Sequence, residues 1–123
     1  VPKDKAKLDK TFGAITVPCF HMTGTLDDSP IGDTKAAQRR APFDHIHAAH
    51  QYLVNFTGGD HFIFSGRWRE QSGGENDALF QEFILESSTA FWQAHLKADS
   101  AALNWLGENF ENTLGDHGVF EKK

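Results

Sequence analysis

Acidic side chains and a histidine occur in two polar loops, each of which follows an apolar run. Asp27 and Asp28 lie within residues 23–30, and His61 lies within residues 57–62 after a pair of glycines. A carboxylate beside an imidazole fixes the imidazole tautomer and stabilises the imidazolium that forms when the ring takes up a proton. An aspartate on one loop and this histidine on the other would therefore make the acid–base part of a nucleophilic catalytic site.

The other histidines and the single cysteine suggest different chemistry. His45, His47 and His50 form the pattern H-x-H-x-x-H, but the zinc-binding pattern H-x-x-x-H is absent. Suitably spaced carboxylates or cysteines are also missing, so no metal site is expected. Cys19 is the only cysteine, which excludes an internal disulfide, a CxxC zinc site and an iron–sulfur cluster.

The composition is that of one globular domain. The chain has 123 residues, of which 39% are hydrophobic, and it contains eleven Phe and three Trp. The net charge of −5 argues against a nucleic-acid partner, because phosphate binding needs clustered Lys and Arg. No apolar run approaches the roughly 18 residues that a membrane-spanning helix needs, so no membrane partner is expected.

Two apolar runs predict the strands that would position the two loops. Residues 15–22 and 52–56 have the length and composition of strands buried on both faces. Residues 33–50 between them are helix-like, and Pro42 divides them into two short helices. A helical crossover between buried strands predicts a parallel pair. Both polar loops then lie at the carboxyl ends of the strands, where functional groups of α/β proteins collect.

The second half of the chain predicts a long helix. Apolar residues follow helical spacing over residues 76–98, and another turn or two is expected over 100–105, ending at Gly107. Residues 65–75 are polar and glycine-rich, which is typical of mobile surface. The tail after Gly115 is expected to be loose. The fold class is therefore α/β.

The two loops and their strands resemble a known family. Residues 15–30 resemble the seventh strand and acid loop of α/β-hydrolases, in which an apolar strand is followed by G-x-x-D and often by proline. Gly24 and Asp27 supply that motif here, and Pro30 follows it. Residues 57–62 resemble the loop after the eighth strand, which carries the family's catalytic histidine.

The resemblance covers roughly residues 14–106 and is strongest to the dienelactone-hydrolase-like esterases. The predicted helix over 76–98 looks like the family's C-terminal helix. The resemblance implies that residues 1–123 are the C-terminal half of one α/β-hydrolase domain, with its last two parallel strands, their crossover helices and a long C-terminal helix. The nucleophile-bearing half would then lie outside this chain.

The resemblance also assigns roles. Asp27 would be the acid of a nucleophile–His–Asp triad and His61 its general base, whereas Asp28 fits the spacing less well and is expected to cap a helix or bond within the loop. The family's G-x-S-x-G motif does not occur here. Ser29 and Ser65 are not on a strand–turn–helix elbow, so neither is expected to be the nucleophile. A Ser or Cys from another chain or segment would supply it.

The implied activity is hydrolysis of carboxylic esters or related acyl bonds in a small-molecule substrate, without a cofactor. Phe62, Phe64 and Trp68 could line an apolar pocket for the acyl or alcohol group. The alternative is a non-catalytic α/β module that keeps the fold and uses its aromatic surface for binding or assembly. A nucleophile motif on a strand–helix turn elsewhere in the protein would favour the enzyme.

Overall fold

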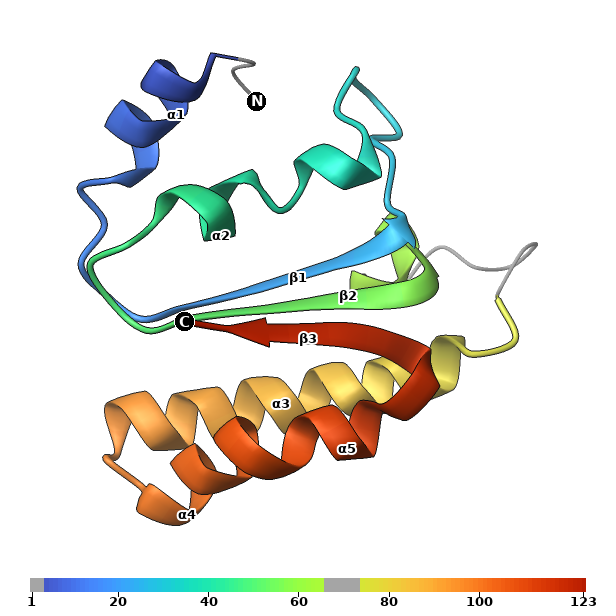
Figure 1. Cartoon of the computed structure of the whole chain (residues 1–123). Coiled ribbons are helices and arrows are strands. Elements are labelled where there is room, and N and C mark those ends of the chain that lie inside the picture. Colours follow the sequence, from blue (N-terminus) through green and yellow to red (C-terminus); the bar gives the residue numbers. More distant parts are fainter. Residues whose placement is uncertain (1–3, 66–73) are drawn as a thin grey trace.

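Three strands form the sheet at the centre of the molecule (Figure 1). The computed structural model describes residues 4–65 and 74–123. The sheet order is β1 (Cys19–Leu26), β2 (Gln51–Asp60) and β3 (Gly118–Lys122). β1 and β2 are parallel and β3 is antiparallel to β2. The predicted α/β class and the predicted parallel pair are confirmed.

Both strands end further along the chain than their apolar runs suggest. β1 begins at Cys19 because Pro18, with no N–H, precedes the first ladder bond, which the Cys19 N–H donates to the His50 carbonyl (3.1 Å). β1 then continues through Thr23 to Leu26. β2 continues to residue 60, so most of the predicted loop over 57–62 is strand.

The tail after Gly115 is not loose, as the sequence suggested, but forms β3. Phe120 lies opposite Val54 in the ladder and is buried. Backbone bonds between Gln51 and Lys123 extend the pairing to residue 123 (2.8 and 2.9 Å). The segment is polar and has only one well-buried apolar side chain, so its sequence lacks the alternating pattern that predicts a strand.

One face of the sheet carries α1 (Lys5–Phe12), the short 3₁₀ turn η1 (Ala36–Gln38) and α2 (Ala41–His45). The predicted helical crossover is therefore present, but the predicted division at Pro42 is wrong, because the break between η1 and α2 falls at Arg39 and Arg40. Pro42 lies in the first turn of α2, where its missing N–H costs nothing.

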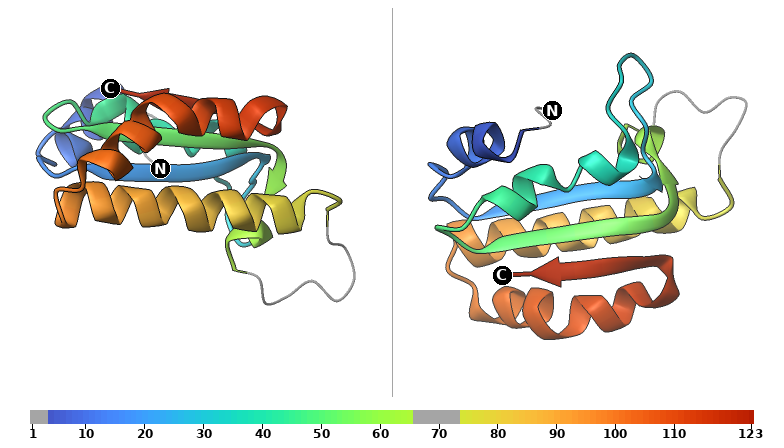
Figure 2. Two further views of the ribbon diagram at one scale, coloured as in Figure 1. Left: turned by 90° about the horizontal axis from the view of Figure 1, so that it is seen from below. Right: turned by 45° about the horizontal axis from the view of Figure 1, so that its top comes forward.

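The other face carries the long helix α3 (Asp77–Leu96), followed by α4 (Ser100–Asn104) and α5 (Phe110–Leu114) (Figure 2). α3 matches the helix predicted over 76–98. The predicted end at Gly107 is wrong, because a π-helical turn over Trp105–Asn109 joins α4 to α5. Leu106, Phe110 and Leu114 recur every four residues and are buried, which carries the helical path past the glycine.

The core lies between the sheet and the layer of α3 and α5. Phe20 from β1 contacts aromatic rings from β2, α3, α5 and β3, with ring centroids 5.8–6.4 Å apart, namely Tyr52, Phe91, Phe110 and Phe120. Such tilted and edge-on pairs stabilise the packing beyond the burial of area. Within residues 4–65 and 74–123, no helix has the length and apolar character that crossing a membrane requires.

Candidate functional site

Asp27 is fixed directly after the end of β1. Its backbone N–H donates to the Gly24 carbonyl (3.0 Å), which turns the chain as the strand ends. The Thr23 hydroxyl donates to Asp27 Oδ2 (2.9 Å), and both residues are 4% exposed. A buried carboxylate needs such hydrogen bonds to offset its lost hydration. Asp27 therefore has one oxygen occupied from its own strand and the other free for a second partner.

His61 is that second partner. It begins the 3₁₀ helix η2 (His61–Phe64), which the Asp60 side chain caps by accepting from the Phe62 N–H (2.9 Å). His61 Nδ1 lies 2.8 Å from Asp27 Oδ1. The predicted hydrogen bond between Asp27 and His61 is confirmed.

The ring of His61 is placed to act on something outside the chain. An ionised carboxylate only accepts, so Nδ1 carries the proton of the neutral ring and Nε2 keeps its lone pair. The His61 side chain is 46% exposed, and Nε2 has no hydrogen bond within the described residues. The chemistry open to it is that of a general base held in one orientation.

The ends of β1 and β2 approach closely to make this contact. A Cβ on Gly24 would overlap the Gly59 carbonyl, and the ladder shifts register between Gly24 and Leu26. The Gly58 N–H donates to the Thr25 hydroxyl (2.8 Å), and Gly58 has φ of +80°, which favours glycine. The glycines therefore allow the approach that brings Asp27 to His61.

Arg39 adds a cation that sequence reasoning missed. Its Nε donates to the Asp27 carbonyl (3.1 Å), and its Nη2 lies 3.4 Å from Asp27 Oδ1. The crossover before α2 thus supplies a countercharge to the buried carboxylate. Thr23, also missed, stands four residues before Asp27 in the segment expected to be a polar loop, so its type and position did not set it apart. Arg39 gave none, because only the folded crossover places it there.

Asp28 points away from this pair. It accepts from Lys35 Nζ (2.7 Å) and from the Ala36 N–H (2.9 Å). The hydrogen bond from Lys35, followed by that from Ala36, holds the pKa of Asp28 below its usual range. The expectation that Asp28 bonds within the loop or caps a helix is confirmed, since it holds the start of η1.

Of the three predicted aromatic residues, Phe62 lies against His61, and Phe64 ends the same 3₁₀ helix. Phe62 and Phe64 are 40% and 37% exposed. The Phe62 ring lies edge-on to the His61 ring, with centroids 6.2 Å apart, and Phe64 packs on Phe56. Trp68 lies outside the described residues. Two hollows, of about 710 and 310 Å³, lie at other places on the surface and do not include His61.

The two rejected serines make local contacts only. The Ser65 hydroxyl donates to the Phe62 carbonyl (3.3 Å), and the Ser29 N–H donates to the Thr34 carbonyl (2.8 Å). Neither hydroxyl bonds to His61 within the part of the chain that the structure describes.

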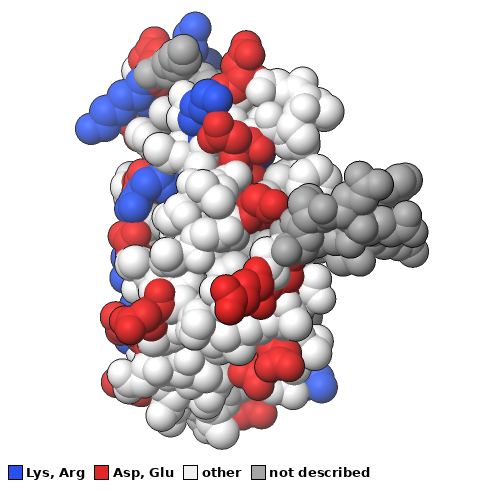
Figure 3. All heavy atoms as spheres, turned by 90° about the vertical axis from the view of Figure 1, so that its right-hand side faces the viewer, with Lys and Arg blue, Asp and Glu red and all other residues white. Residues whose placement is uncertain are grey.

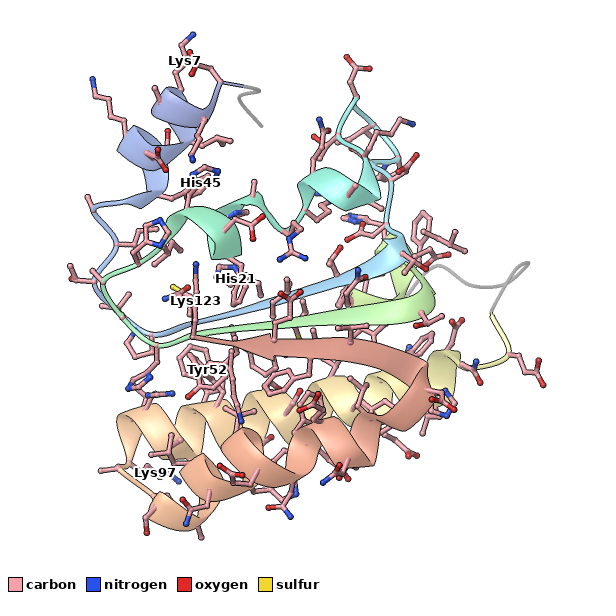
Figure 4. The ribbon with its side chains drawn as sticks, in the orientation of Figure 1. Lys7, His21, His45, Tyr52, Lys97 and Lys123 are labelled. Carbon is pink, nitrogen blue, oxygen red and sulfur yellow. The ribbon has the colours of Figure 1, made fainter. Side chains whose placement is uncertain are left out.

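The remaining histidines are dispersed. His45 Nδ1 lies 2.5 Å from Asp9 Oδ1 and joins α2 to α1, as Figure 4 shows. His50 instead lies near His95, with ring centroids 6.1 Å apart. Among the described residues, no three His, Cys, Asp or Glu side chains are grouped so that they could hold a metal ion.

The surroundings of the site are acidic. Figure 3 faces the end of the molecule at which β1 and β2 finish. Acidic side chains are spread over the middle of this face, whereas Lys and Arg lie mainly toward its upper and left margins. The field at this end therefore disfavours a negatively charged ligand.

Comparisons with protein-family models, with curated proteins and with solved structures found no match.

Proposed function

We propose that this chain supplies the acid and the general base of a hydrolase that cleaves carboxylic esters or related acyl bonds. The observation that carries the proposal is the 2.8 Å contact between Asp27 and His61 at the ends of adjacent parallel strands. The order of strand, acid loop, crossover, strand and histidine agrees with the resemblance to dienelactone-hydrolase-like esterases.

In this mechanism Nε2 of His61 takes the proton of a nucleophilic hydroxyl or thiol as that group attacks the acyl carbon. Asp27 holds the ring and stabilises the imidazolium without accepting the proton itself. The imidazolium then protonates the departing alcohol oxygen as the acyl–oxygen bond breaks. Water attacks the acyl-enzyme by the same route in reverse, which releases the acid and restores the nucleophile.

The nucleophile is proposed to be a Ser or Cys on another chain or on a further segment, together with the N–H groups that hold the oxyanion. The place for this addition is the free side of β1. Among the described residues β1 forms one edge of the sheet. A further parallel strand there would bring its own carboxyl end beside Asp27.

The substrate is proposed to be uncharged near the scissile bond. Phe62 and Phe64 offer apolar surface beside His61, and Trp68 is proposed to add to it. The acidic surroundings in Figure 3 would repel a substrate carboxylate. A neutral aryl or alkyl ester is therefore the first substrate to test.

The experiment compares the wild type with Asp27→Asn in the protein completed with its nucleophile-bearing chain or segment. Hydrolysis of a neutral ester should fall on the order of 10⁴-fold, because the amide no longer selects the right tautomer. Asp28→Asn is the matched control and should stay within about threefold of wild type, since Asp28 faces Lys35. Full activity in Asp27→Asn, with the fold intact, would overturn the proposed role of Asp27, whereas no hydrolysis by the wild type would favour the non-catalytic binding module.

A further inference from the structure

α3 is apolar on two opposite faces. Successive residues turn by about 100°, and the buried side chains Phe83, Ser87 and Ala94 share one face, which contacts the core. The opposite face bears Leu85, Trp92 and Leu96, which are 67%, 55% and 74% exposed. These three residues, spaced by seven and four positions, are called the outward stripe below.

The outward stripe is continuous with a groove beside α4. The groove, of about 710 Å³, shares Leu85 with the stripe and extends over small side chains to an indole ring, its lining including Thr89, Ala90, Ala102 and Trp105. In the left view of Figure 2 no other element lies in front of α3. Exposed apolar side chains that form one continuous patch mark interaction sites, so this face calls for a partner.

The charged side chains beside the outward stripe are acidic toward the start of α3 and basic at its end. Glu82 and Glu86 lie in the first half of α3, and Lys97 caps its other end, as Figure 4 shows. All three are exposed, and none forms an ion pair within the described residues. A partner helix with complementary charge would place a cation opposite Glu82 and an anion opposite Lys97.

A second copy of α3 in the antiparallel direction has that pattern. Glu82 and Lys97 lie on the same flank by helical periodicity, and in an antiparallel pair like flanks meet. When the two-fold axis passes near Ser88 and Thr89, Leu85 of each copy faces Trp92 of the other. Glu82 then falls beside Lys97 of the second copy, and the two small side chains at the axis allow the helices to approach.

We propose that two copies of this chain form a dimer through antiparallel α3 helices, with the outward stripes packed on each other. The opposed helix dipoles and two Glu82–Lys97 contacts fix the direction of pairing. The contact leaves β1 and its edge uncovered, because α3 turns the stripe away from the sheet. The dimer is thus independent of the proposed hydrolytic function.

The test is the mass in solution by light scattering over a concentration series. The wild type should be a dimer at tens of micromolar. Trp92→Asp should weaken the dimer by about 100-fold or more, because two-fold symmetry places two charges in the apolar contact. Ile31→Asp is the matched control, since Ile31 is 96% exposed in a loop, and it should not change the mass.

Charge reversal tests the direction of the pairing. Glu82→Lys and Lys97→Glu should each weaken the dimer by roughly 3-fold or more, and the double variant should recover most of the loss. A circular dichroism spectrum and thermal unfolding like those of the wild type would show that the variants fold.

The proposal is wrong if the wild type is monomeric at 100 µM, or if a dimer persists in Trp92→Asp. Failure of the double reversal to recover affinity would overturn the antiparallel arrangement. A dimer lost only on adding a nucleophile-bearing segment would place the contact at the β1 edge instead.

Discussion

Two of the histidine–aspartate pairs among the described residues differ in which partner is buried. In both, Nδ1 meets Oδ1, at 2.8 Å for His61 and Asp27 and at 2.5 Å for His45 and Asp9. The Asp27 side chain is 5% exposed and that of His61 is 46% exposed. In the other pair the Asp9 side chain is 49% exposed and that of His45 is 14% exposed.

The difference shows that a short contact alone does not make a general base. In the first pair the carboxylate is buried among Thr23 and Arg39, while the ring faces outward and can exchange a proton with a substrate. In the second pair the ring is covered, and the carboxylate lies in water on α1. That arrangement ties two helices together but offers no accessible nitrogen to a reacting group.

The largest expected effect is the difference in ester hydrolysis between variants of His61 and of His45. If the proposed hydrolase is correct, His61→Ala in the protein completed with its nucleophile-bearing chain or segment should lower ester hydrolysis by about 10³-fold or more, because the nucleophile would lose its base. His45→Ala should remain within about threefold of wild type, since its ring nitrogen bonds to Asp9 on α1 and not to the Asp27–His61 pair. Initial rates on a neutral aryl ester measure both. Equal losses would show that the comparison misplaces the base.

The next effect concerns the approach of the strand ends. Gly24→Ala should lower stability by about 1–3 kcal/mol, because the new Cβ would overlap the Gly59 carbonyl and force the strands apart. It should also lower activity by separating Asp27 from His61. Thermal unfolding and ester hydrolysis measure the two losses.

Gly107→Ala is the matched control for that substitution. A Cβ on Gly107 meets no atom within 4 Å, and the residue lies in a helical turn. Alanine should therefore leave activity unchanged and stabilise the fold by up to about 1 kcal/mol. A Gly24→Ala variant as stable and active as Gly107→Ala would contradict the close approach.

A smaller effect tests the role of the Asp9–His45 pair. The hydrogen bond to His45 lowers the pKa of Asp9 from its ordinary value of 3.8. A lowered carboxyl pKa contributes stability that is present above the ordinary pKa and lost as pH falls through the folded value. Asp9→Asn should therefore lower the Tm slightly at pH 6, and the difference should shrink below pH 3.8. A Tm difference that grows as pH falls would contradict this sign.

The smallest effect is expected at His95, which has no carboxylate partner within residues 4–65 and 74–123. Its Nε2 lies 3.2 Å from the Tyr52 hydroxyl, and burial, followed by the charge of nearby His50, lowers its pKa from the ordinary 6.5. The unfolded chain takes up this proton first, so stability should fall as pH drops below 6.5. His95→Gln should flatten that part of the Tm profile. If His95→Gln leaves the slope of Tm against pH unchanged, His95 is not the source of that pH dependence.

The contact between Asp27 and His61 could be predicted because each residue follows a predicted strand. Parallel strands bring their carboxyl ends together, whatever the exact strand boundaries are. The same reasoning predicted that Asp27, and not Asp28, would contact His61. It could not predict Arg39, whose contact depends on the path of the crossover. It also missed β3, because Phe120 is a single buried side chain in a polar segment and its pairing with β2 depends on contacts distant in sequence.

The exposure of these side chains could not be predicted from the sequence either. His45 and His61 are the same residue type, and both stand near aspartates in the fold, yet only packing decides which ring is covered. The outward stripe of α3 shows the same point. Leu85, Trp92 and Leu96 also recur at helical spacing, and only packing decides that their face lies on solvent.

The most direct test of the account is the tautomer of His61, read from the ¹⁵N shifts of both ring nitrogens by NMR at a pH where the ring is neutral. The account predicts a proton on Nδ1, bonded to Asp27, and a free lone pair on Nε2, with this state lost in Asp27→Asn. A neutral ring with its proton on Nε2 in the wild type would contradict it, because that nitrogen could then not take the proton of a nucleophile.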